Sequence, residues 1–347
     1  MKALVYHGAH DVRCETVPDP TPSDAAGAVV RVERASICGS DLNLYHGNLS
    51  PVGGFTVGHE FVGEIVEVGS EVSEHRVGDR VMVSGVIGCG KCVSCIRGEV
   101  VRCLNGGTQV FGTTPDLAGG QAEAVAVPAA DHACRAIPDG VSVEQATLLT
   151  DILPTGFFGA RNADLQPGQS VVIIGMGPVG LMALMSAQLF GPAQILAVDR
   201  VPERLEKARS LGATPVDADG DVATAVLQAT HGVGADAVIE AVGADETVQL
   251  ALDLVRPGGV VSAIGVNMNF AFPFNMASAF MKDLTFRIGL VPVPELWPSL
   301  VPLVAGGRLS PEVIFTHHMG LSEGPRAYEI FDKREDGVMK ILLDPTK

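Results

Sequence analysis

Four cysteines in the stretch CGKCVSCIRGEVVRC form the densest group of reactive side chains in this 347-residue sequence: Cys89, Cys92, Cys95 and Cys103. Their spacing, C-x2-C-x2-C-x7-C, allows four thiolates to converge tetrahedrally on one zinc ion. A thioredoxin-like redox pair is the alternative, but such a pair would open a helix after a strand and would need no further cysteines. The spacing therefore predicts a zinc site, and four cysteine ligands make it structural because no position stays open for substrate.

A second possible metal site begins at Cys38, in ICGSDLNLYHG, and continues 21 residues later with His59 and Glu60, in GHEFVGEIVEVG. A thiolate together with an imidazole is a typical donor pair for zinc. A catalytic zinc takes three protein ligands and keeps one open position. Nothing nearby supplies a third ligand, so we expect it from a distant part of the chain.

The stretch IIGMGPVG places glycines in the pattern G-x-G-x-x-G at Gly175, Gly177 and Gly180, with Pro178 and Val179 inside the loop. The pattern follows a β-branched run and opens a helical one, which is the context of a dinucleotide-binding loop. Glycine there permits the tight turn, close approach of a pyrophosphate and packing of the helix on the strand.

The next strand pattern, QILAVD, ends at Asp199, 19 residues after Gly180. A carboxylate at this point can accept hydrogen bonds from both ribose hydroxyls of the adenosine and would repel a 2′-phosphate. The position therefore favours NAD over NADP. Arg200 and Arg204 weaken this preference because their charges could partly offset the repulsion.

Composition limits the partners of the chain. With 24 basic and 40 acidic residues the net charge is −16, which disfavours nucleic acid and anionic lipid, since both need a basic surface. The first residues, MKALVYHGAHDVRCETV, contain no apolar core of a signal peptide. We therefore expect a cytoplasmic protein whose thiols stay reduced.

Two sequence patterns divide the chain. Up to about residue 150, short β-rich runs separated by glycine and proline predict mostly antiparallel strands. From about residue 168, buried strand patterns alternate with helical stretches, which predicts a doubly wound parallel sheet of Rossmann type. The uncharged run VVIIGMGPVGLMALMSAQLF belongs to this region; glycines and a proline interrupt it, so we expect a strand and a helix instead of a membrane span. The fold class is α/β with a second, mostly β domain.

The stretch GHEFVGEIVEVGSEV matches the signature G-H-E-x2-G-x5-G-x2-V. With the four-cysteine segment and GMGPVG…D, the sequence resembles the zinc-containing medium-chain alcohol dehydrogenases along nearly its whole length, and it looks closest to their bacterial tetrameric members. The resemblance implies a GroES-like catalytic domain at 1–151 and 287–347, a structural zinc lobe at about 88–104, and a Rossmann domain at 152–286. It also implies a homotetramer, with a homodimer as the alternative.

The resemblance supplies the missing metal ligand. In the family, the positions of Cys38 and His59 bind the catalytic zinc with a third ligand just before the cofactor domain, where this sequence reads LLTDILPTGFFGA. Many relatives have cysteine there, whereas this chain has Asp151, as formaldehyde dehydrogenases and some bacterial alcohol dehydrogenases do. A carboxylate keeps the formal charge of a thiolate, so the site with its zinc ion and three ligands stays formally neutral. A simple helix-capping role for Asp151 is the alternative. Two zinc ions per chain are expected in all.

Further roles follow from the same resemblance. Ser40 corresponds to the first group of a proton relay, Asp41 to the carboxylate that orients the imidazole of His59, and Glu60 to a glutamate that can approach the zinc. A solvated or salt-bridged role for Glu60, and a capping role for Asp41, stay open.

One position departs from the family pattern. Several relatives complete the relay with a histidine five residues after the zinc cysteine, where this chain has Asn43, which does not titrate. Either His46 replaces it or water takes the proton directly, and we favour water because a histidine three residues on need not face the same way. Capping of the loop is the other role open to His46.

Later positions resemble nucleotide contacts and pocket walls. Lys340 stands where a basic residue approaches the pyrophosphate, with a lone surface lysine as the alternative, and Leu49, Val86 and Leu290 are possible pocket walls. The expected cofactor contacts beyond the glycine loop are Val242, Gly265, Val266, Leu290 and Lys340.

The resemblance implies an NAD-dependent zinc alcohol dehydrogenase that interconverts a primary or secondary alcohol with an aldehyde or ketone. A polyol, sugar or amino-alcohol dehydrogenase of the same family is the alternative, although the apolar wall positions favour hydrophobic alcohols. Zinc-free NAD(P)H-binding relatives without enzymatic activity form a third class, which Cys38, His59 and Asp151 disfavour.

Overall fold

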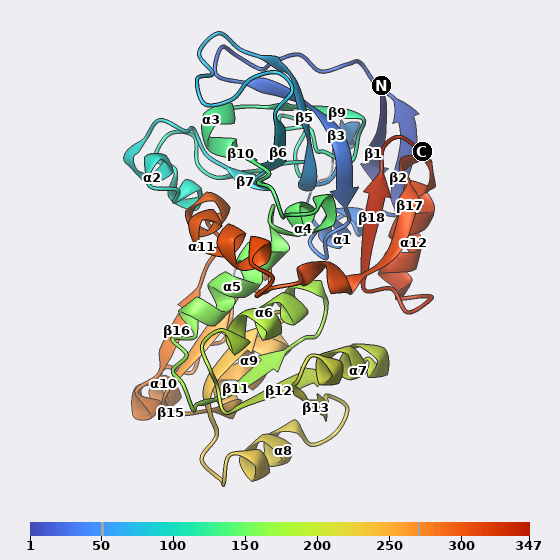
Figure 1. The fold of residues 1–347 in the computed structure, drawn as a ribbon. Helices are drawn as coiled ribbons and strands as arrows, with labels where there is room; N and C mark the ends of the chain where they lie inside the picture. The colour runs from blue at the N-terminus through green and yellow to red at the C-terminus, as the bar shows by residue number, and fades with distance from the viewer. Residues whose placement is uncertain (50–51, 270) are drawn as a thin grey trace. The chain divides into compact units, whose positions relative to one another are not determined.

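The computed structural model describes residues 1–49, 52–269 and 271–347, and the chain divides into two units (Figure 1). The first comprises Met1–Pro154 and Val291–Lys347, and the second comprises Thr155–Leu290. The expected boundaries lay three to four residues earlier in the chain, after 151 and after 286. The second unit extends further because β16 (Thr285–Ile288) pairs with β15 (Val255–Ala263) and so belongs to its sheet.

The first unit is built mainly from antiparallel strands. Its larger sheet has the order β10-β6-β5-β3-β18-β17, with β9 also paired to β3, and a smaller sheet has the order β2-β1-β4. Alternating apolar residues of these strands fill a core that includes Tyr6, Phe61 and Ile65. The strands are β1 (Lys2–Gly8), β2 (Asp11–Thr16), β3 (Ala28–Ser36), β4 (Phe55–Thr56), β5 (Glu60–Val68), β6 (Arg80–Val83), β7 (Val86–Ile87), β8 (Gln109–Val110), β9 (Ala124–Val127), β10 (Cys134–Ala136), β17 (Phe315–Gly320) and β18 (Lys340–Asp344).

The C-terminal segment returns to the first unit. Strand β18 pairs antiparallel with β3, so that Leu342 lies opposite Ser36 and Leu343 opposite Ala35. This pairing brings the start of β18 close to the loop that follows β3. Helices of this unit are α1 (Asp41–Tyr45), α2 (Val93–Ile96), α3 (Ala130–Ala133), α4 (Val143–Leu148), α11 (Val293–Ala305) and α12 (Gly324–Lys333), with α5 (Ile152–Asn162) crossing the boundary and 3-10 turns η1 (Val100–Arg102), η2 (Pro311–Ile314) and η3 (Leu321–Glu323).

The second unit is one parallel six-stranded sheet with the order β13-β12-β11-β14-β15-β16. The order reverses between β11 and β14, which confirms the doubly wound α/β class. Its remaining strands are β11 (Ser170–Ile174), β12 (Gln194–Asp199), β13 (Thr214–Asp217) and β14 (Ala235–Glu240), and its helices are α6 (Pro178–Gln188), α7 (Pro202–Ser210), α8 (Val222–Ala229), α9 (Asp245–Leu254) and α10 (Met276–Lys282).

The uncharged run at 171–190 divides between β11 and the 11-residue helix α6. Both elements are buried because parallel strands and their crossover helices are covered on both sides. Among the residues that the structure describes, none of the helices is long and apolar enough to cross a membrane.

Asp236 on β14 forms hydrogen bonds to the two neighbouring strands of the parallel sheet, β11 and β15. Its carboxylate accepts hydrogen bonds from the backbone and hydroxyl of Ser170, each at 2.8 Å, and from Nε of Arg256 at 2.7 Å. Burial raises the pKa of this carboxyl, but the hydrogen bonds from Ser170 and Arg256 lower it by a larger amount. The pKa of Asp236 therefore lies below the usual value. The ionised form is therefore the one that stabilises the fold.

We expect Asp236→Asn to lower the free energy of unfolding by about 1–3 kcal/mol at pH 7. Because the folded-state pKa is depressed, this stabilisation is present above about pH 4 and is lost as the pH falls through the folded-state pKa. Urea unfolding at pH 7 and near pH 3 measures it, with Asp253→Asn on the surface of α9 as the control. If the free energies of unfolding of wild type and Asp236→Asn differ by the same amount at both pH values, the ionised carboxylate of Asp236 does not stabilise the fold.

Candidate metal and nucleotide sites

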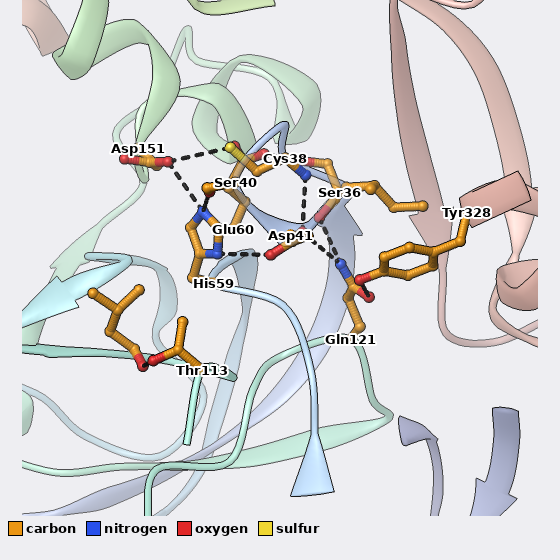
Figure 2. A network of polar contacts seen from close by, with 12 residues as sticks. Ser36, Cys38, Ser40, Asp41, His59, Glu60, Thr113, Gln121, Asp151 and Tyr328 are labelled. Carbon is orange, nitrogen blue, oxygen red and sulfur yellow. Dashed lines mark hydrogen bonds and ion pairs between the residues drawn. The ribbon is translucent and has the colours of Figure 1, made fainter. Parts of the chain in front are cut away.

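Three side chains from distant parts of the sequence meet in the first unit (Figure 2). Cys38 follows β3, His59 precedes β5, and Asp151 precedes α5. Nε2 of His59 lies 3.2 Å from Oδ2 of Asp151, and Sγ of Cys38 lies 3.7 Å from the same oxygen. We call these three residues the Cys38 cluster.

Asp41, the first residue of α1, fixes the orientation of His59. One oxygen of Asp41 lies 3.0 Å from Nδ1 of the imidazole, and the other accepts the backbone N–H of Cys38 at 2.9 Å. The opposite ring nitrogen, Nε2, therefore faces Cys38 and Asp151. A carboxylate that binds the far nitrogen of a histidine is the usual way to aim the imidazole at a metal.

The donor set of the Cys38 cluster fits a divalent zinc ion. A sulfur, an imidazole nitrogen and a carboxylate oxygen converge, and with Glu60 they lie within 4.8 Å of one another. Burial lowers the pKa of His59, but Asp41 and Asp151 raise it more, to well above the usual value. The two carboxylates thus favour a positive charge at this position, which a divalent zinc ion would supply.

Glu60 is fully buried beside the cluster and is paired with Lys340. Oε2 of Glu60 lies 2.6 Å from Nζ of Lys340 and accepts the hydroxyl of Ser36, while Nζ also donates to the carbonyl of Ile37 at 2.8 Å. The other oxygen, Oε1, has no hydrogen-bond partner among the described residues. An orphaned buried carboxylate oxygen beside three metal donors fits a nearby cation.

These contacts exclude the alternative that Lys340 is a lone surface lysine. The side chain is fully buried, with an exposed fraction of 0%. Burial lowers its pKa, but Glu60 and Cys38 raise it more, so the ammonium stays charged. Lys340 is therefore not a surface lysine, and its ammonium is paired with the carboxylate of Glu60.

The four cysteines of the lobe at 88–104 are also brought together. All four thiols are free, and they lie within 4.8 Å of one another, with Sγ atoms of Cys92 and Cys95 3.5 Å apart and those of Cys89 and Cys95 3.9 Å apart. Four sulfurs around one zinc, at about 2.3 Å each, stand about 3.8 Å apart. A Cβ at Gly88 would lie 2.6 Å from Sγ of Cys95, so this position requires glycine.

The glycine loop of the second unit joins β11 to α6. Gly175 has φ +91°, Gly177 is the N-cap of α6, and a Cβ at Gly180 would lie 1.7 Å from the carbonyl oxygen of Gly175. Pro178 and Val179 open the helix, whose free N–H groups and dipole favour a phosphate. Gly175 is thus explained by its backbone conformation and Gly180 by close packing, whereas a Cβ at Gly177 would meet only Arg204, at 3.7 Å.

Asp199 lies at the end of β12, next to this loop. One carboxylate oxygen accepts the N–H of Met176 in the loop at 2.6 Å, and the other accepts the N–H of Val201 at 2.9 Å. Arg200 is exposed, and the guanidinium of Arg204 lies 3.7 Å from the position of a Cβ on Gly177. The acid, the loop and one arginine therefore share one edge of the sheet.

Comparison with known proteins identifies the family. The model "Zinc-binding dehydrogenase" matches residues 178–306, and "Alcohol dehydrogenase GroES-like domain" matches residues 24–139. A "Probable zinc-binding alcohol dehydrogenase" of Mycobacterium tuberculosis is 44% identical over 99% of this chain and 89% of its own length. The chain belongs to the zinc-binding alcohol dehydrogenases.

Two further relatives extend the comparison. The solved structure of the alcohol dehydrogenase TADH from Thermus sp. ATN1 superposes on this dehydrogenase with a TM-score of 0.93, at 44% identity and 99% coverage of both chains. A sorbitol dehydrogenase of Bacillus subtilis is 31% identical over all of this chain and 98% of its own length. The expected family, the GroES-like and Rossmann fold and the oxidoreductase class are confirmed.

Ser40 lies at the Cys38 cluster of the dehydrogenase, and His46 does not. Oγ of Ser40 is 3.3 Å from Nε2 of His59. Nε2 of His46 instead lies 2.7 Å from Oδ1 of Asp332 on α12. His46 caps the C-terminal end of α1, while Asp41 at the other end contacts the cluster. The two side chains thus lie at opposite ends of α1, and the relay role of His46 stays a prediction beside the favoured role of water.

Two buried residues that sequence reasoning missed support the cluster of the dehydrogenase. Nε2 of Gln121 donates to Oδ2 of Asp41 at 3.3 Å and to the carbonyl of Ser36 at 3.1 Å, and the hydroxyl of Tyr328 donates to Oε1 of Gln121 at 2.9 Å (Figure 2). The only sequence signal is Gly58 of the GHE motif, where φ is +94° and a Cβ would lie 2.3 Å from Cγ of Gln121.

The remaining expected cofactor contacts lie at the ends of later strands. Glu240, at the end of β14, accepts the N–H groups of Val242 and Gly243 and so shapes that loop. A Cβ at Gly265 would lie 2.1 Å from the nitrogen of Gly243, so the two loops touch. Exposed apolar side chains in this region are Val242, Val266 and Leu290.

Proposed function

We propose that this dehydrogenase transfers hydride reversibly between a primary or secondary alcohol and NAD, with a catalytic zinc held by Cys38, His59 and Asp151. The observation that carries the proposal is the convergence of these three donors, with His59 aimed at the other two by Asp41. When bound, the zinc supplies a Lewis acid that lowers the pKa of an alcohol hydroxyl and polarises a carbonyl oxygen.

The ligands set the charge of the site. The thiolate of Cys38 and the carboxylate of Asp151 each contribute one negative charge, and His59 is neutral when its Nε2 binds metal. The sum with a divalent ion is zero, which limits the cost of burying the site. A carboxylate is a harder and weaker donor than a second thiolate, so the metal is somewhat more electrophilic than with two cysteines.

Ser40 moves the proton of the alcohol. Its hydroxyl lies 3.3 Å from Nε2 of His59, the nitrogen that would bind the zinc, so it would lie close to an alcohol bound to that ion. Oγ accepts the proton of the alcohol as it releases its own, and water takes that proton onward because His46 is engaged with Asp332. Asn43, which has no titratable group, does not take part.

The second unit holds NAD. The glycine loop and the N-terminus of α6 bind the pyrophosphate, and Asp199 accepts hydrogen bonds from the adenosine ribose. The negative charge of Asp199, which also accepts two backbone N–H groups, disfavours a 2′-phosphate despite the nearby Arg204. When bound, the nicotinamide accepts the hydride.

The remaining proposals concern the structural zinc, the cellular location and the oligomeric state. Cys89, Cys92, Cys95 and Cys103 hold a structural zinc, which gives two zinc ions per chain. The protein acts in the cytoplasm as a homotetramer, with a homodimer as the alternative.

The alternative function is that of a polyol or sugar dehydrogenase, and the 31% identical sorbitol dehydrogenase supports it. The two proposed functions differ in the polarity of the substrate, so a panel of substrates distinguishes them. Zinc-loaded protein is assayed with aliphatic alcohols, polyols, amino alcohols and the matching carbonyl compounds, each with NAD(H) and NADP(H), at 340 nm. We expect the largest kcat/KM for an apolar alcohol with NAD. Polyol oxidation alone supports the alternative, and no turnover of any substrate contradicts both.

A further inference from the structure

A second group of metal donors lies in the first unit, outside the Cys38 cluster and the cysteine lobe. His10 comes from the turn between β1 and β2, His46 from the end of α1, and Asp332 from α12. Each offers one donor atom, and the three atoms lie within 4.8 Å of one another. Residues from three separate parts of the chain therefore present two imidazoles and one carboxylate at a single place.

Contacts along all three elements hold these side chains in position. The N–H of His10 donates to the carbonyl of Tyr45 at 2.6 Å, and its ring packs edge-on against Tyr45 at 4.9 Å. The ring of Tyr45 in turn packs 5.4 Å from that of Tyr328 on α12. The β1–β2 turn, α1 and α12 are thus fastened to one another through Tyr45, whatever ion the group binds.

His10 and His46 face each other across this junction. Their ring centroids are 5.3 Å apart, and His10 has a left-handed backbone conformation with φ 58°. Histidine tolerates this conformation better than most residues, although glycine would be less strained. Nε2 of His46 lies 2.7 Å from Oδ1 of Asp332.

We propose that His10, His46 and Asp332 form a third metal site, which binds a divalent transition-metal ion such as Zn²⁺. Bonds from zinc to nitrogen or oxygen are about 2.0–2.2 Å long, so two donors of one ion lie up to about 4.4 Å apart. Donor atoms that already lie within 4.8 Å need only small rotations to reach it.

The exposure and the charge of the group suit an exchangeable ion. His10 and His46 are exposed and Asp332 is half-buried, so an ion can enter from solvent and water can complete its coordination. Two imidazoles with one carboxylate favour zinc, nickel or copper over magnesium and calcium, which prefer oxygen ligands. One carboxylate against a divalent ion leaves a positive site, which this acidic chain with net charge −16 tolerates.

Metal bound here would act on α1 from its far end. His46 ends α1, whereas Asp41 at its start orients His59. An ion shared with Asp332 would therefore tether α1 to α12 and stabilise the helix that positions the Cys38 cluster. None of the three donors is a member of that cluster, so the site is structural or regulatory.

Metal counting tests the proposal. Wild type, His10→Gln, His46→Gln and Asp332→Asn are dialysed against the same low free Zn²⁺ concentration, and bound zinc per chain is measured by mass spectrometry of the metal. The control is His231→Gln, since His231 is also an exposed histidine with positive φ, at 54°. We expect wild type and control to bind one more zinc per chain than the other three variants. The expected loss of affinity exceeds about tenfold, the smallest effect usual for removing even an outer partner of a metal site.

The design does not depend on how far the other zinc sites are filled, because only the difference between proteins is used. Thermal unfolding with and without Zn²⁺ is the second readout: the metal should raise the midpoint more for wild type than for His46→Gln. Equal zinc content and equal shifts would mean that His46 and Asp332 form an ion pair only, which overturns the proposal. Loss of the extra ion in His231→Gln would also overturn it.

Discussion

Asp151→Asn should remove one zinc ion per chain and lower kcat/KM by more than about 100-fold. An amide is neutral and donates weakly, so the Cys38 cluster loses both a ligand and half of the negative charge that balances the ion. Loss of a partner one shell further out already costs about 10- to 100-fold, so loss of a direct ligand should cost more. Metal analysis and steady-state kinetics with the best substrate of the panel measure the two effects.

The informative control is Asp151→Cys. A thiolate restores the charge and the donor, as in the relatives that have cysteine at this position, so this variant should retain its zinc and most of its activity. Asp139→Asn, an exposed substitution elsewhere in the same unit, should change neither quantity. If Asp151→Asn keeps its full zinc content, Asp151 is not a ligand and its proposed place in the site is wrong.

Short-range motifs could be interpreted from the sequence because their geometry is local. The cysteines of the lobe lie within 15 consecutive residues, and the glycine pattern occupies six residues from the end of β11 into the first turn of α6. Spacing alone therefore limits which side chains can meet. Asp151 was a different case: it lies 92 residues beyond His59, and only resemblance to a family suggested that the two would meet.

Contacts between residues far apart in the sequence could not be predicted from it. Lys340 and Ile37 are 303 residues apart, and Tyr328 and Gln121 are 207 apart. Their contacts depend on the pairing of β18 with β3 and on the docking of α12, which no local pattern encodes. A lone lysine and a lone glutamine therefore carried no signal of burial. The partner of His46 could not be predicted for a related reason, since a helix as short as α1 can direct its two ends to different sites.

Lys340→Met should lower the free energy of unfolding by about 3–5 kcal/mol. Lys340 and Glu60 are both fully buried, with Nζ 2.6 Å from Oε2. Methionine has a similar length but no charge, so the carboxylate of Glu60 would remain buried without a counter-ion. Oε1 of Glu60 already lacks a hydrogen-bond partner among the described residues, which leaves little to compensate. Urea unfolding at pH 7 measures the loss.

The double variant Lys340→Met with Glu60→Gln distinguishes the effect of the unpaired charge on stability from the effect of the changed side-chain shapes. Removing both charges should recover much of the loss, because replacing a whole buried ion pair is often nearly neutral whereas breaking one is costly. Lys347→Met breaks an exposed pair with Asp344 in which the lysine is 75% exposed, and should cost less than about 1 kcal/mol. If Lys340→Met costs no more than Lys347→Met, Glu60 is not charged in the folded protein. A neutral Glu60 would not balance the charge of the proposed zinc ion, because only its ionised form carries a negative charge.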